Sequence, residues 1–159
     1  MFKVFVSYST HDLNNVEQLQ QSLKGSGIEV FVAEHSVVAS EVLATKISAA
    51  IAACDLFVLV WSENARVSEW VPQEIGKAHS LGKPILPLVL TEGLHLPAFI
   101  NDLKYLPVFK DPQWAMGEAQ KFIMDQYLQK QRAAKEKEEE NLKGLFVLGG
   151  IALWLFSQK

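Results

Sequence analysis

The sequence has few of the residues that define several common kinds of functional site. Cys54 is the one cysteine among 159 residues, so an intramolecular disulfide is excluded and no second thiolate is available for a zinc site. The net charge is −3 and no basic stripe is present, which argues against nucleic acid as a partner. No glycine-rich loop of the Walker or dinucleotide-binding type occurs either.

Targeting signals are also missing from the start of the chain. Residues 1–6 lack the basic and long apolar segments of a secretory signal peptide, and they lead directly into a strand-like run. We therefore expect the main part of the protein to stay in the cytoplasm. The apolar content of 49% predicts a folded core, and 159 residues suit one domain with a short appendage.

Five β-rich apolar runs alternate with stretches that carry apolar residues at helical spacing. These runs are 3–7, 28–33, 55–61, 85–90 and 105–109. Strands that are apolar on both faces and alternate with helices are typical of a parallel sheet covered on both sides. The sequence therefore predicts an α/β fold, with a central parallel sheet of about five strands and helices on both faces. Asp111 and Pro112 then predict the start of a long helix that runs towards residue 140.

The segment from Ser68 to Glu74 follows the third apolar run and opens a stretch with helical periodicity. Trp70 and Glu74 are four residues apart, so a helix places both side chains on one face. This face lies near the carboxyl end of a parallel strand, where open α/β sheets bind ligands. We therefore interpret Glu74 as the candidate for chemistry. The alternative from spacing alone is a solvated carboxylate that pairs with Lys77 or Lys46.

Three motifs, in this order, resemble those of Toll/interleukin-1 receptor (TIR) domains. The first is Val-Phe-Val-Ser-Tyr-Ser at 4–9, and the second is the run Asp-Leu-Phe-Val-Leu-Val-Trp-Ser at 55–62. The third, Trp70-Val71-x-x-Glu74, resembles the tryptophan-to-glutamate motif of TIR domains that cleave NAD+. The resemblance covers residues 3–125, so we expect a TIR domain at 1–128 with the flavodoxin-like fold of the family.

The resemblance implies an NAD+ glycohydrolase or cyclase in bacterial immune or stress signalling. Glu74 is then the catalytic carboxylate, which opposes the positive charge of an oxocarbenium-like ribosyl transition state. Trp70 walls the pocket, and the nucleotide is bound by Ser7, Tyr8, Ser9 and Thr10. NAD+ is the substrate, so neither a cofactor nor a metal is expected. The product is ADP-ribose or a cyclic ADP-ribose type signal, which a separate downstream effector would sense.

Two departures from the family pattern keep other functions open. The loop 34–40 has no glycine, although relatives self-associate through this loop, and the arginines that some relatives carry are replaced by Ser9 and Thr10. One alternative is a non-catalytic adaptor that acts by TIR–TIR association. A nucleoside deoxyribosyltransferase-like enzyme is the other alternative, because that group has a similar sheet and also uses a glutamate.

The end of the chain has a different composition. Residues 129–143 predict a charged helical linker, and 144–159 form an apolar tail. The thirteen residues of its apolar run, 144–156, span about 20 Å as a helix, less than the roughly 30 Å of a bilayer core. A highly charged linker before an apolar run with Trp154 near its end still favours a membrane helix. The excess of basic residues before the run favours a main domain that faces the cytoplasm. The alternative is a helix that packs on the domain or associates with copies of itself.

Overall fold

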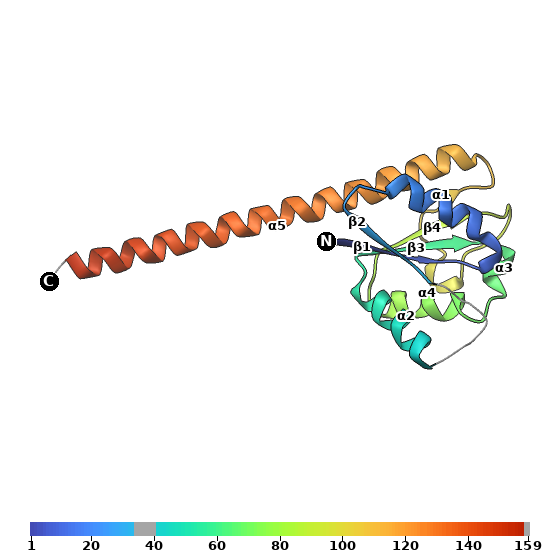
Figure 1. Cartoon of the computed structure of the whole chain (residues 1–159), viewed down its shortest axis with the longest axis horizontal. Helices are drawn as coiled ribbons and strands as arrows, with labels where there is room; N and C mark the ends of the chain where they lie inside the picture. Colours follow the sequence, from blue (N-terminus) through green and yellow to red (C-terminus); the bar gives the residue numbers. More distant parts are fainter. Residues whose placement is uncertain (34–40, 158–159) are drawn as a thin grey trace. The chain divides into compact units, whose positions relative to one another are not determined.

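The computed structural model describes residues 1–33 and 41–157, and a parallel five-stranded sheet forms its centre (Figure 1). The sheet order is β2-β1-β3-β4-β5, which is the flavodoxin-like order. The predicted fold class is therefore confirmed. The strands are β1 (Phe2–Ser7), β2 (Ile28–Val32), β3 (Leu56–Trp61), β4 (Ile85–Val89) and β5 (Leu106–Pro107).

Helices cover both faces of this sheet. One face packs against α1 and the first turns of α5, and the opposite face packs against α2 and α4 (Figure 1). The helices are η1 (Thr10–Asp12), α1 (Leu13–Leu23), α2 (Glu41–Ala53), α3 (Glu63–Arg66), α4 (Val71–Ser80), η2 (Ala98–Ile100) and α5 (Pro112–Ser157).

A row of phenylalanines crosses three strands beneath α2 and α4. Phe5 of β1 stacks on Phe57 of β3 and on Phe31 of β2, each with ring centroids 5.4 Å apart. These residues occupy matching register positions in the parallel sheet. Because strand side chains alternate between faces, Ser7 lies on the same face of β1 as Phe5. The last residue of β1 therefore points towards the layer that holds α4.

Lys83, in the loop between α4 and β4, caps the end of α2. Its Nζ donates hydrogen bonds to the carbonyl oxygens of Ala52 at 2.6 Å and Cys54 at 2.8 Å. The last carbonyls of a helix lack intrahelical partners, and a cation at this end also interacts favourably with the helix dipole. This contact fixes the end of α2 to the turn that follows α4.

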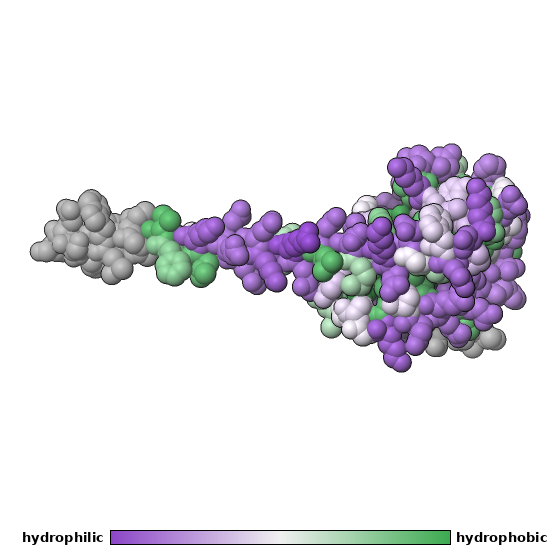
Figure 2. Space-filling model, turned by 90° about the horizontal axis from the view of Figure 1, so that it is seen from above, coloured by the Kyte–Doolittle hydropathy of each residue, from purple (hydrophilic) through white to green (hydrophobic). Residues whose placement is uncertain are grey.

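The chain forms two compact units, Met1–Ile123 and Met124–Lys159. The second unit consists of the remainder of α5, so residues 129–143, predicted as a linker, belong to a helix that continues to Ser157. On the face seen in Figure 2 this helix is hydrophilic before a short apolar band. Its exposed apolar side chains include Leu142, Leu145 and Phe146.

The predicted membrane attachment of residues 144–159 is wrong. Within the described parts of the chain, no helix combines the length and the apolar content that a membrane crossing requires. The physical reason is that the uncharged run is short and directly follows Lys143 and the charged residues 135–140. The loop 34–40, which was expected to mediate self-association, lies outside the described residues.

We expect Lys83→Met to lower the free energy of unfolding by about 1–3 kcal/mol, because two carbonyl oxygens lose a charged donor. Urea denaturation followed by circular dichroism measures this change, with Lys104→Met at an exposed lysine as the matched control. Equal stability of the two variants would show that the cap does not contribute.

Candidate active site

The start of α4 sets the orientation of the candidate carboxylate. Ser68 precedes the helix, and its Oγ accepts hydrogen bonds from the backbone N–H groups of Trp70 at 3.2 Å and Val71 at 3.4 Å. Proline at the second helical position suits a first turn, where its missing N–H is not needed. Glu74 follows in this first turn, at the end of the helix that favours negative charge.

Glu74 lies on the buried face of α4, in line with Val71, Ile75 and Ala78. Its side chain is only 3% exposed. The hydroxyl of Ser7, at the end of β1, donates a hydrogen bond to Glu74 Oε2. Burial raises the pKa of Glu74 to about 7, and the hydrogen bond from Ser7 acts in the opposite direction. The carboxyl group is therefore poised to change its charge near neutral pH.

A cavity of about 230 Å³, here called the Glu74 cavity, lies between α2 and α4. Its polar residues come mostly from α4, and its apolar wall comes mostly from α2. The lining residues are Ala44, Ile47, Ser48, Ile51, Trp70, Gln73, Glu74 and Lys77. The cavity thus combines one carboxylate, one lysine and a largely apolar wall, which is the usual composition of a small-molecule site.

A second cavity of about 290 Å³, here called the Thr10 cavity, lies on the other side of Trp70. It is more polar, and it is formed by the loop after β1, by α3 and by the segment before α4. Its lining residues are Ser9, Thr10, His11, Asn64, Val67, Ser68, Glu69 and Trp70. Because Trp70 lines both cavities, the two hollows are adjacent and share this residue in their walls.

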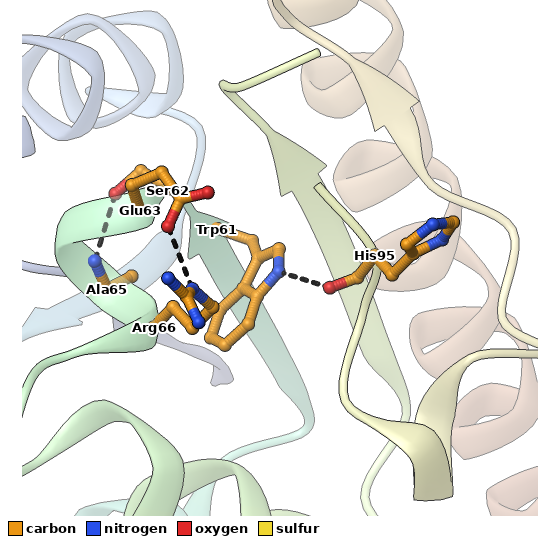
Figure 3. Close-up of polar contacts among 6 residues, drawn as sticks. All are labelled: Trp61, Ser62, Glu63, Ala65, Arg66 and His95. Atoms are coloured by element: carbon orange, nitrogen blue, oxygen red, sulfur yellow. Dashed lines mark hydrogen bonds and ion pairs between the residues drawn. The ribbon is translucent and has the colours of Figure 1, made fainter. Parts of the chain in front are cut away.

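The loops around these cavities are held by specific hydrogen bonds. Ser62 follows β3, and its hydroxyl donates to Asp12 Oδ2 at 2.5 Å while it accepts from the N–H of Ala65 at 3.0 Å. This bond joins the loop after β1 to the start of α3, across the point where the strand order reverses. Figure 3 shows a hydrogen bond to the loop after β4, in which Trp61 Nε1 donates to the carbonyl oxygen of His95 at 3.0 Å; neither residue lines the two cavities.

A larger hollow of about 780 Å³ lies against α1 and β2, and it is a poorer candidate. Its lining includes Lys24, Gly25 and Ile28, which lie at the amino end of β2. Parallel α/β sheets bind ligands at the carboxyl ends of their strands, where Ser7 and Ser62 lie. We therefore assign the candidate site to the Glu74 and Thr10 cavities.

The structure brings together most of the residues predicted for the site. Glu74 and Trp70 line one cavity, and Ser9 and Thr10 line the adjacent one with Trp70. Ser7 contacts Glu74, and it is fully buried. Tyr8 is 4% exposed and lines neither cavity.

Sequence reasoning missed several residues that line the two cavities. Gln73 and Lys77 follow Trp70 at helical spacing, so the face defined by Trp70 and Glu74 already pointed to them. Ser48 shares a helix face with Ala44 and Ile51 of α2, which the same periodicity indicates. Asn64 and Glu69 lie in loops and short helices, and no periodic signal marks them. Among the described residues, no cluster of three or more metal-binding side chains occurs.

The chain belongs to the TIR domain family, since the family model for the TIR domain matches residues 4–123. This match covers the five strands except the first two residues of β1, and it includes every residue named above as lining the two cavities. The sequence matches no curated protein.

Solved structures share the fold at low sequence identity. The TIR domain of the Toll-related receptor TRR-2 from Hydra magnipapillata has a TM-score of 0.63 at 21% identity, covering 80% of this chain and 99% of that chain. A prokaryotic SEFIR domain has a TM-score of 0.56 at 20% identity, covering 77% of this chain and 99% of that one. The TIR domains of the activated Roq1 resistosome have a TM-score of 0.47 at 22% identity, covering 56% of this chain and 57% of that chain. The first two similarities establish the fold alone.

The buried Glu74 predicts a specific dependence of stability on pH. Its pKa is raised from 4.5 to about 7, so between these values the folded protein holds a proton that the unfolded chain has released. The contribution of Glu74 to the free energy of unfolding therefore falls as pH rises from 4.5 to 7, by about 3 kcal/mol in total. We expect Glu74→Gln to remove this contribution, so that the variant gains stability relative to the wild type between pH 4.5 and pH 8.

Urea denaturation of both proteins at pH 4.5, 6 and 8 measures this difference. Glu92→Gln, at an exposed carboxylate, is the control and should follow the wild type at each pH. A constant stability difference between Glu74→Gln and the wild type would contradict a raised pKa.

Proposed function

We propose that this TIR domain is an NAD+ nucleosidase that cleaves the bond between nicotinamide and ribose, with Glu74 as the catalytic carboxylate. The observation that carries the proposal is the placement of Glu74. It is buried, it lines a cavity at the carboxyl edge of the sheet, and burial raises its pKa to about 7. Burying a carboxylate in this way costs folding stability, and perturbed groups in clefts are concentrated at functional sites.

The chemistry requires little more than one well-placed negative charge. The C–N bond breaks with its electron pair passing to the pyridinium nitrogen, so nicotinamide leaves as a neutral molecule without protonation. Positive charge develops on the ribosyl group, and the Glu74 carboxylate stabilises it from within a largely apolar cavity. Attack by water then gives ADP-ribose and a proton, whereas attack by a nitrogen of the adenine base gives a cyclic ADP-ribose isomer.

The two cavities suggest how a dinucleotide would be accommodated. The Glu74 cavity of about 230 Å³ is smaller than the 300–1,000 Å³ that is usual for a drug-sized ligand. It suits the nicotinamide-ribose end, with Trp70 as its wall. The adjacent Thr10 cavity then takes the next part of the substrate, where Ser9 and Thr10 offer hydroxyl groups. Among the described residues that line this cavity there is no lysine or arginine, so hydroxyls and backbone N–H groups would contact the phosphates.

A non-catalytic adaptor is the alternative proposal. TIR domains associate with one another, and a chain of this family needs no catalytic carboxylate for that purpose. Self-association through 34–40, the role of a downstream effector and the place of this protein in immune or stress signalling stay predictions. The buried carboxylate favours the enzyme, because an adaptor would gain nothing from burying it.

We expect the wild-type protein to release nicotinamide from NAD+, and Glu74→Gln to lose at least about a hundredfold in rate, because removal of one transition-state contact commonly has an effect of this size. Chromatography with mass detection identifies nicotinamide and the accompanying product. Glu92→Gln serves as the matched control and should retain full activity.

Protein concentration is varied in the same assay, so that activity which requires association is detected. Nicotinamide release by Glu74→Gln at the wild-type rate would overturn the catalytic assignment. No release by the wild type at any concentration would support the adaptor instead.

The ionisation of Glu74 predicts the pH dependence of the reaction. Only the carboxylate can oppose the developing positive charge, so kcat/KM for NAD+ should rise about tenfold per pH unit below the pKa of Glu74 and level off above it. Since the pKa of Glu74 is about 7, the plot of log(kcat/KM) against pH should change slope near neutral pH. A rate that falls as pH rises from 5 to 7 would contradict this role.

A further inference from the structure

Ser7 was expected to contact the nucleotide, yet the structure places it beneath the site. Its exposed fraction is 0%, and its backbone is paired with Leu59 in the centre of the sheet. Neither the Glu74 cavity nor the Thr10 cavity has Ser7 in its lining. A ligand that occupies these cavities therefore has no direct access to the Ser7 hydroxyl in this conformation.

The Ser7 hydroxyl is directed at the candidate carboxylate. It donates to Glu74 Oε2, and the two residues come from elements 67 positions apart in the sequence. Both groups are buried, so water competes little for either of them. A hydrogen bond to an ionised oxygen in such surroundings is stronger than one between neutral groups. It therefore fixes one carboxylate oxygen of a residue that lines the Glu74 cavity.

We infer that Ser7 is a positioning residue for the proposed reaction: its hydroxyl orients the Glu74 carboxylate and favours its ionised form, and it does not bind substrate. The inference rests on the proposed function of Glu74. The rigidity of the donor follows from the fold, because β1 is hydrogen-bonded to β2 on one side and to β3 on the other. A serine has a single side-chain torsion before its hydroxyl, so little freedom remains once the strand is fixed.

The first test measures the protonation of Glu74 and needs no substrate. The carboxyl carbon of Glu74 is followed by nuclear magnetic resonance from pH 5 to 9.5 in ¹³C-glutamate-labelled protein, and Glu74→Gln assigns the signal. We expect the midpoint in Ser7→Ala to lie about one pH unit above the wild-type midpoint, because the carboxylate loses its donor. Ser22→Ala is the matched control, since the Ser22 hydroxyl donates to the Leu19 carbonyl within α1.

Ser7→Cys provides a second variant of nearly the same shape with a weaker donor. Its midpoint should lie between those of the wild type and Ser7→Ala. Identical midpoints in the wild type and in a folded Ser7→Ala or Ser7→Cys protein would overturn the inference.

The second test separates positioning from substrate binding. At pH 9.5, where Glu74 is ionised in most molecules of each variant, we expect Ser7→Ala to have a kcat at least about fivefold below that of the wild type, with KM changed less than about twofold. A raised KM with unchanged kcat would show that Ser7 contacts substrate and would overturn the inference. If the wild type cleaves no NAD+ while the titration midpoint still shifts, the proposed function fails and the contact between Ser7 and Glu74 stands.

Discussion

The burial of one carboxylate is the constraint on which this domain depends. Glu74 occupies a position on α4 that the helical period otherwise assigns to apolar residues such as Val71 and Ala78. An ionised group in that place is unfavourable without a donor, and Ser7 supplies one from the neighbouring layer. The contact therefore sets how α4 must lie on β1, and the wall of the Glu74 cavity follows from that docking.

Other contacts hold the strands and loops at the carboxyl edge of the sheet, where the two cavities lie. The stacked Phe5 and Phe57 rings fix β1 against β3 in the layer below the site. At the carboxyl ends of these strands, the bond from Ser62 to Asp12 joins the two loops that border the Thr10 cavity. Both cavities thus lie where the order of the strands reverses, and Trp70 stands between them. The TIR fold supplies this edge, whereas the chemistry depends on which side chains line it.

The sheet and its helices could be predicted because apolar periodicity is a local signal. The alternation of runs such as 55–61 with helical stretches predicted a parallel α/β sheet, and the predicted strand ends lie within about two residues of those observed. Local patterns are a less reliable guide to where a helix begins, because the same residues can cap either an α-helix or a 3₁₀ turn. Ser9 and Asp12 have the spacing of a helix capping box, but a 3₁₀ turn intervenes and α1 begins at Leu13. The role of Ser7 depends on a contact across the sheet, which no local pattern reports. The predicted membrane attachment of residues 144–159 was wrong because the prediction gave more weight to the apolar composition of the tail than to its short length.

The long sequence separation between Ser7 and Glu74 has a consequence for folding. Their contact forms only after β1, β3 and α4 have assembled, since parallel strands require crossover connections and non-local contacts are gained late. In a partly folded chain Glu74 is a solvated carboxylate on a loose segment, without a cavity around it. A nascent or partly unfolded chain therefore lacks the site as well as the fold, and any activity at this site would appear only when folding is complete.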